Sequence, residues 1–260
     1  MVQVTPTNRR DILRAGAALA GGGAFTAGCG NTSEDAPPHP AANLASAAPT
    51  SASPAPASPK PLPAQITHGP RTRPIVALTF HGQGDPALAT QLLTTAEKHG
   101  ARLTVLAVGS WLDAYPAMAR RILDGGHDLG NHTQRHISIN AMAEADARKE
   151  IADCAERLKH LTGSIGSWFR PSRAPTATPL VVRLAADVGY PHVLSYDVDS
   201  LDYTRPGATA VTRKVLAEVR GGSVVSMHFG YPDTVAALPG VLQELDRRGL
   251  RAVTTTELLS

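Results

Sequence analysis

Short apolar segments alternate with helical patterns from Arg73 to the carboxyl terminus of this 260-residue chain. The expected strands are residues 75–80, 103–108, 127–130, 167–169, 193–196, 223–227 and 251–254. The expected helices are residues 86–99, 113–125, 141–161, 179–188, 209–219 and 235–248. About seven strand–helix units favour one α/β domain, built as a parallel barrel or an open parallel sheet. In both architectures, functional side chains gather at the carboxyl ends of the strands.

Side chains that suit catalysis or metal binding follow the ends of several of these strands. They are His81 and Asp85 after the first strand, His132 and His136 after the third, Arg170 after the fourth, Asp199 and Asp202 after the fifth, and His228 after the sixth. Histidine, aspartate and arginine are the residue types from which α/β enzymes build their sites. The sequence therefore predicts a functional site at this edge of the strands.

His132 and His136 are four positions apart. On one helical turn, their rings would face the same way and could share a cation. Paired histidines also occur on surface turns, so the spacing alone leaves both interpretations open. Their place at a strand end, among the other polar strand ends, favours a metal site.

In this order, the polar segments resemble the motifs of the polysaccharide deacetylases, the carbohydrate esterase family 4 or NodB homology domain. The matching segments are Thr79-Phe80-His81-Gly82, His132-Thr133-Gln134-Arg135-His136, Phe169-Arg170-Pro171, Asp199-Ser200-Leu201-Asp202-Tyr203 and Ser226-Met227-His228. The second segment fits the family pattern His-Ser/Thr-x-x-His without change. The resemblance runs from Arg73 to the carboxyl terminus and implies a distorted (β/α)7 barrel.

The resemblance also implies a mechanism. A divalent cation, most often zinc, would lie on His132, His136 and a carboxylate, where it would polarise the acetyl carbonyl and acidify a water molecule. A carboxylate would take the proton of that water. His228, oriented by Asp202, would protonate the leaving sugar amine.

Further residues take supporting roles by the same resemblance. Arg170 would hold the base or Asp202 in place, and the backbone N–H of Arg173 would help to bind the oxyanion. Tyr203 and Tyr231 lie on loops expected at the active face and are candidates for stacking on sugar rings.

The first motif departs from the family pattern, because the base and the metal-binding aspartate fall on His81 and Gly82. Glycine has no side chain with which to bind a metal. In one interpretation, which we favour, His81 becomes the third ligand or the base, and Asp85 supplies a carboxylate. In a second, water fills the third position and activity is low; in a third, the domain only binds glycan. Asp85 has the alternative role of helix N-cap.

Residues 1–29 have the features of an export signal. Arg9 and Arg10 precede a mild apolar stretch, residues 15–27, which resembles a Tat signal and is too short and glycine-rich to span a bilayer. Thr26-Ala27-Gly28-Cys29 resembles a lipobox, in which Cys29 would be lipidated; ordinary cleavage after a nearby small residue is the alternative. We therefore expect an exported protein, anchored through Cys29 at the outer face of the cytoplasmic membrane or in the cell wall.

Residues 30–72 are expected to form a disordered linker ahead of a folded domain at 73–260. Within residues 36–65, 23 of 30 residues are Ala, Pro or Ser, which offers too little apolar surface to offset the loss of chain entropy. Cys154, the other of the two cysteines, would have no disulfide partner, and its helical pattern suggests a small core residue.

The net charge of +3 includes +2 from residues 1–28, where Arg9, Arg10 and Arg14 outnumber Asp11. The rest of the chain is nearly neutral, which argues against nucleic acid as a partner. We expect a monomer. The expected function is a metal-dependent hydrolase that removes N-acetyl groups from a peptidoglycan-like or chitin-like glycan. A membrane-tethered, inactive glycan-binding protein and a hydrolase of another ester or amide are the alternatives.

Overall fold

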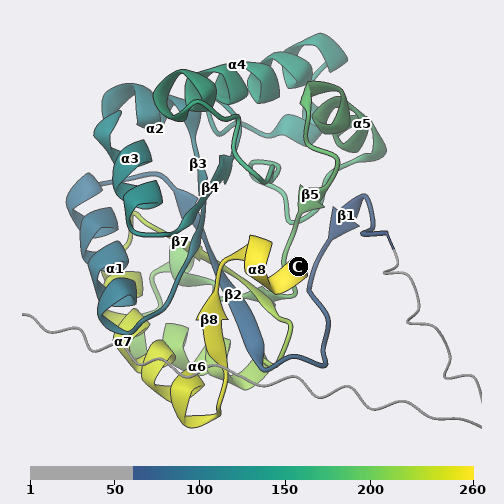
Figure 1. Cartoon of the computed structure of the whole chain (residues 1–260). Coiled ribbons are helices and arrows are strands. Elements are labelled where there is room, and N and C mark those ends of the chain that lie inside the picture. Colours follow the sequence, from purple (N-terminus) through teal and green to yellow (C-terminus); the bar gives the residue numbers. More distant parts are fainter. Residues whose placement is uncertain (1–60) are drawn as a thin grey trace, which may run out of the picture. The chain divides into compact units, whose positions relative to one another are not determined.

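Parallel strands lie at the centre of the structure, a computed structural model that describes residues 61–260, and helices lie around them (Figure 1). The strands are β1 (Gln65–Ile66), β2 (Ile75–Gly82), β3 (Thr104–Ala107), β4 (Asp128–Asn131), β5 (Val193–Leu194), β6 (Val198–Asp199), β7 (Val224–His228) and β8 (Arg251–Val253). The α-helices are α1 (Pro86–Lys98), α2 (Gly109–Ala114), α3 (Ala117–Asp124), α4 (Glu144–Thr162), α5 (Pro179–Val188), α6 (Ala208–Glu218), α7 (Pro232–Arg247) and α8 (Thr255–Leu259). Two short 3-10 helices are η1 (Ile139–Ala141) and η2 (Asp202–Thr204).

The central strand is β2, within the strand order β4-β3-β2-β7-β6. These neighbours pair in parallel, and β8 pairs in parallel with the first residues of β2. Strand β5 pairs with β1, and parallel bridges through Phe169 link β4 to β5. The backbone N–H of Asp197, after β5, donates to the carbonyl of Val224 in β7. The strands therefore curve into the distorted (β/α)7 barrel that the resemblance implies.

Local signals in the sequence correctly set several element boundaries. The apolar run at the start of β2 is buried, as expected for a parallel strand covered on both faces. Asp85 caps α1 ahead of Pro86, and its Oδ1 accepts the backbone N–H of Ala87 at 2.8 Å. Gly163 ends α4 in the left-handed conformation, at φ 84°. Cys154 is a free, buried residue of α4, as expected.

The structure differs from the expected elements in other places. The folded part begins before Arg73, because Gln65–Ile66 of the expected linker form β1 against β5. The expected helix at 113–125 is two helices, α2 and α3, divided around Tyr115 and Pro116. The expected strand at 167–169 is reduced to single bridges at Phe169. Strand β6 and helix α8 were not predicted, since two and five residues carry almost no periodicity.

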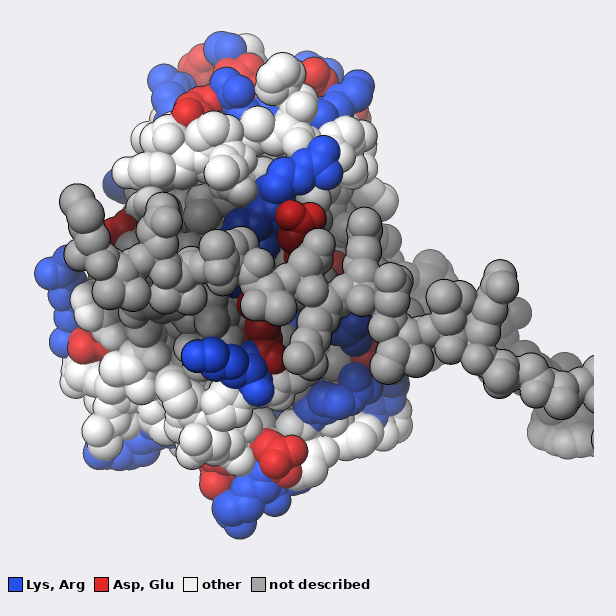
Figure 2. All heavy atoms as spheres, turned by 60° about the vertical axis from the view of Figure 1, so that its left-hand side comes forward, with Lys and Arg blue, Asp and Glu red and all other residues white. Residues whose placement is uncertain are grey.

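Charged side chains of both signs are interspersed over the face shown in Figure 2. Among residues 61–260, no helix is long and apolar enough to cross a membrane. The expected signal segment and most of the expected linker, up to residue 60, lie outside the described residues.

Candidate metal and catalytic site

The carboxyl ends of β2, β4 and β7 bring histidines together. The parallel register between β2 and β7 places His81 directly beside His228, with ring centroids 4.3 Å apart. His132 comes directly after β4, and its ring centroid also lies 4.3 Å from that of His81. The structure therefore brings these three strand ends together, as the sequence predicts.

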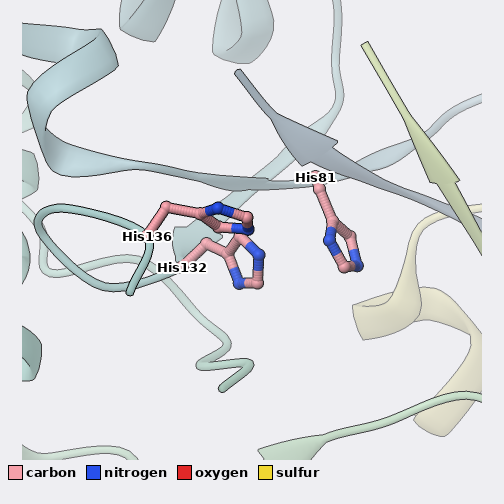
Figure 3. A group of neighbouring side chains, drawn as sticks. All are labelled: His81, His132 and His136. Atoms are coloured by element: carbon pink, nitrogen blue, oxygen red, sulfur yellow. The ribbon is translucent and has the colours of Figure 1, made fainter. Parts of the chain in front are cut away.

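His81, His132 and His136 form a group that could hold a metal ion (Figure 3). One ring nitrogen from each lies within 4.8 Å of the other two. In a tetrahedral zinc site, nitrogens at about 2.0–2.1 Å from the metal are roughly 3.3 Å from one another, so the rings would close by about 1.5 Å at most. Figure 3 shows His132 and His136 side by side and His81 facing them from β2.

His132 gives the clearest indication that the three rings suit a cation. Its Nδ1 lies 3.0 Å from the carbonyl oxygen of Arg170, so Nδ1 carries the proton and donates it to that carbonyl. Its Nε2 is then a bare acceptor, buried and without a hydrogen-bond partner among residues 61–260. Buried polar atoms are rarely left unpaired, so the donor set fits a cation at this point.

The three rings are ready to bind a metal in their neutral forms. Burial, and then the charge of neighbouring histidines, lowers the pKa of His81 and of His132 well below the usual range. Burial and the nearby Arg173 charge lower the pKa of His136 to about 4. Neutral imidazole is the form that ligates metals.

The loop after β4 places His136 by an unexpected route. His132 and His136 do not lie on a helical turn; residues 132–138 form a loop, in which Thr133 and His136 have left-handed backbones at φ 68° and 56°. The N–H of Thr133 donates to Oδ1 of Asn131, and the N–H of His136 donates to the Thr133 hydroxyl. Buried Glu150 anchors the same loop by accepting from the backbone and side chain of Arg135.

Ser226 and Gly82 define the surroundings of His81. The Oγ of Ser226 lies 3.3 Å from Nε2 of His81, which leaves the other ring nitrogen of His81 for a ligand. A Cβ at Gly82 would meet Cγ1 of Val105 at 2.9 Å and Cα of Ala107 at 3.0 Å. An aspartate at position 82 would therefore point into β3 and not toward the histidines.

His228 and Asp202 form a second pair at the strand ends, with the contact that the resemblance implies. Asp202 is fully buried, and its Oδ1 lies 2.6 Å from Nδ1 of His228. Its Oδ2 accepts the backbone N–H of His228 at 2.8 Å and the hydroxyl of Thr234 at 2.7 Å. His228 keeps one ring nitrogen for the site, and part of its side chain is exposed.

Arg170 does not hold Asp202, which corrects one expectation. Its guanidinium is fully buried and donates to the hydroxyl of Thr79 and to the carbonyls of Leu194 and Ser195. It therefore ties β2 to the chain after β5, while its own carbonyl orients His132. Burial lowers the pKa of Arg170 to about 10.

Asp85 does not join the site, which corrects a second expectation. Its carboxylate caps α1 through Ala87, and it lies outside the group of histidines that could hold a metal. The capping pattern of aspartate followed by proline already indicated this alternative. Asp85 therefore does not supply the catalytic carboxylate that was expected from this loop.

Two hollows flank the histidines. One, of about 360 Å³, is lined by His81, Gln83, Gly84, His136, Arg173, Arg205, His228, Gly230 and Tyr231. The other, of about 330 Å³, is lined by His81, His136, Arg173, Ala174, Pro175, Tyr196, Asp199, Tyr203, Ser226 and His228. The predicted Arg173, Tyr203 and Tyr231 thus border the site. The rings of Tyr203 and Tyr231 lie edge-on to His228, at 5.5 and 5.7 Å between centroids.

Asp199 and Ser226 belong to the matched motifs without a role of their own, and Arg205 was not predicted to join the site. Among residues 61–260, Asp199 is the one acidic residue that lines either hollow. It pairs with Ser226 across β6 and β7. The strand-end rule indicated Asp199 as a polar residue of this edge, although the two-residue strand that carries it was not predicted.

Comparisons with known proteins agree with this geometry. Residues 68–193 match the family model described as polysaccharide deacetylase. The chain is 30% identical to a peptidoglycan-N-acetylglucosamine deacetylase of Bacillus cereus, over 73% of this chain and 90% of the relative. It is 28% identical to a chitooligosaccharide deacetylase of Sinorhizobium fredii, over 68% of this chain and 87% of the relative.

Solved structures show the same fold. A crystal structure of a peptidoglycan N-acetylglucosamine deacetylase superposes with a TM-score of 0.71 at 26% identity, covering 75% of this chain and 92% of the other. A mutant with restored activity of a pseudoenzyme from Bacillus anthracis superposes with a TM-score of 0.72 at 25% identity, covering 76% and 72%. The barrel, the ordered motifs and these similarities together establish that this chain belongs to the polysaccharide deacetylase family.

Proposed function

We propose that this protein is a metal-dependent hydrolase that removes N-acetyl groups from a cell-wall glycan. The observation that carries the proposal is the group His81, His132 and His136, in which the buried Nε2 of His132 has no partner among the described residues. The printed activities of the relatives, on peptidoglycan and on chitooligosaccharides, support glycan as the substrate class.

Zinc is the metal that this donor set favours. Three neutral imidazoles with one open position match the composition of known catalytic zinc sites. When bound, the ion would supply Lewis acidity, which polarises a carbonyl oxygen and lowers the pKa of water. His81 replaces the family's missing carboxylate ligand in this arrangement, and Ser226 orients its ring.

The acid of the reaction is His228. Asp202 holds Nδ1 of His228, so the proton delivered to the leaving amine would come from Nε2. The rings of Tyr203 and Tyr231 both lie edge-on to this ring and would hold a sugar ring against it.

For the base we assign Asp199. His81 and Asp85 were the expected sources of a base. His81 belongs to the group that would bind the metal, and the carboxylate of Asp85 caps α1. The Asp199 carboxylate lines the same hollow as His81 and His228 and can accept the proton of an attacking water.

A second candidate is an inactive, glycan-binding protein. It is supported by the all-histidine donor set, which lacks the negative charge of the family's metal site. The fold similarity to a protein described as a pseudoenzyme also supports it.

Metal content and acetate release from one preparation separate the two candidates. Purified protein would be assayed for bound zinc and for acetate release from peptidoglycan and chitin oligomers. His132→Ala and His81→Ala should lose both zinc and activity, whereas His160→Ala, at an exposed histidine on α4, should keep both. Bound zinc without acetate from any glycan would favour the binding protein, and acetate release from small acetyl esters alone would indicate another ester substrate.

The location of the protein in the cell is a separate proposal. The twin arginine and the lipobox-like Thr26-Ala27-Gly28-Cys29 support export and lipid anchoring, with the Ala, Pro and Ser-rich segment as a tether. Cys29→Ala should move the protein from the membrane fraction to the soluble exported fraction. An unchanged distribution would exclude the anchor.

A further inference from the structure

We propose that the glycan accepted at this site carries a carboxylate beside its N-acetyl group, and that Arg173 and Arg205 bind this carboxylate. The inference rests on the proposed function, because it names the substrate class of the same site. A lactyl ether on the sugar, as in muramic acid, has this chemistry.

The first argument is the charge of the larger hollow. Of its lining residues, Arg173 and Arg205 are the two permanent cations, and none is an aspartate or glutamate. The same hollow contains His81, His136 and His228, so a sugar placed for the reaction lies next to both guanidinium groups.

The second argument is that both arginines are oriented by the loops that carry them. Arg173 and Arg205 have left-handed backbones, at φ 54° and 56°. Nε of Arg173 donates to the carbonyl of His136 at 3.0 Å, which leaves its terminal nitrogens available. The guanidinium of Arg205 lies over the ring of Tyr231, with Cζ 5.7 Å from the centroid. Planar guanidinium groups of this kind match the geometry of a carboxylate.

The third argument is that neither guanidinium is neutralised. No salt bridge links Arg173 or Arg205 to a carboxylate of residues 61–260, whereas Arg135 and Arg71 pair with Glu150 and Asp197. Two unpaired cations that converge in a concave site favour an anionic ligand.

The smaller hollow has a different character, which gives the glycan an orientation. It contains Asp199 together with Tyr196 and Tyr203, and of the two arginines it contains only Arg173. A carboxylate would be repelled from Asp199 and drawn to Arg205. The carboxylate-bearing sugar therefore lies in the larger hollow, and an uncharged neighbour lies in the smaller one.

The test compares two forms of one substrate. Peptide-free glycan strands of peptidoglycan would be used intact, where the lactyl groups supply the carboxylates, and after amidation of those carboxylates. For the wild type, kcat/KM for acetate release should be at least about tenfold higher on the intact than on the amidated strands, mainly because KM is lower. The ratio of these two kcat/KM values should shrink at high salt. Arg173→Gln and Arg205→Gln should each bring the ratio toward one.

Arg120→Gln is the matched control, because Arg120 is an exposed arginine of α3 away from both hollows. It should keep the wild-type ratio. Equal rates on intact and amidated strands, or wild-type ratios in both site variants, would overturn the proposal while leaving the deacetylase function in place.

If neither strand releases acetate, the deacetylase function fails and binding still tests the inference. Calorimetric titration of the full chain should then give tighter binding of intact than of amidated strands, with the difference lost in Arg173→Gln and Arg205→Gln. Equal binding of the two strands would overturn the proposal on its own.

Discussion

The buried carboxylate of Asp202 binds His228 twice, at Nδ1 over 2.6 Å and at the backbone N–H over 2.8 Å. One oxygen fixes the tautomer of the ring, and the other fixes the strand end from which the ring projects. The free ring nitrogen of His228, Nε2, is therefore directed by a residue that is itself fully buried.

Asp202→Asn should remove this control with little change in size. The amide presents a donor where a carboxylate oxygen accepted, so His228 would carry its proton on the wrong nitrogen. We expect kcat to fall by roughly 10²- to 10⁴-fold, with KM nearly unchanged. Steady-state acetate release measures this, beside Asp246→Asn at an exposed carboxylate of α7 as the control. An unchanged kcat would exclude His228 as the acid.

Asp199→Asn should separate catalysis from metal binding. The variant keeps the acceptor for the N–H of Leu201 but loses the charge that could take a proton. We expect kcat to fall by about 10²-fold or more while bound zinc stays constant. Full activity in this variant would mean that another group, with His81 the first choice, accepts the proton.

Asp85→Ala is the informative contrast to Asp199→Asn. Because Asp85 caps α1, its loss should cost about 1 kcal/mol of unfolding free energy and leave kcat at the wild-type value. Chemical denaturation and acetate release on the same preparation measure both effects. A large loss of kcat would restore Asp85 as a catalytic residue.

Ser226→Ala should weaken metal binding without removing a ligand. The hydroxyl lies 3.3 Å from Nε2 of His81, and residues that orient metal ligands typically contribute about 10- to 100-fold in affinity. Competition with a zinc chelator gives the dissociation constant. Ser223→Ala, immediately before β7 and hydrogen-bonded to Arg71 and Asp197, is the control and should keep wild-type affinity. Equal affinities would show that Ser226 does not orient His81.

His127 should make the folded state sensitive to acid. Burial is the largest effect and lowers the pKa of His127, and the charge of Arg121 lowers it further. The neighbouring carboxylates of Glu97 and Asp128 raise the pKa but do not reverse the shift. The folded state therefore binds fewer protons than the unfolded state below the usual pKa of about 6.5, and stability is full above that pH and declines as pH falls. The slope is at most about 1.4 kcal/mol per pH unit for one proton.

The measurement is urea unfolding between pH 7 and 5 with a chelator present. His127→Gln retains an amide that can accept from the backbone N–H of Leu103 and donate to Glu97, but it does not titrate. Its slope should be smaller than that of the wild type. Identical slopes would exclude His127 as a source of acid sensitivity.

Much of the barrel could be predicted because burial leaves a periodic record in the chain. The apolar run of β2 and the caps of α1 and α4 are local features, and the structure confirms them. His132 and His136 could be identified by their place after a strand end, although the helical turn expected for them is a loop. Pairing of Gln65–Ile66 with β5 could not, because it joins segments more than a hundred residues apart.

The sequence by itself determined the family, the order of the strand ends and the histidines that gather there. Only the tertiary structure decided that His81 faces His132 and His136, that Asp85 caps a helix, that Arg170 binds strand-end carbonyls and that Asp199 borders the site. The physical reason is that local patterns report whether a residue is buried or exposed. Which side chains converge depends on strand register and on loops such as 132–138, whose left-handed residues aim His136 without any periodic signal.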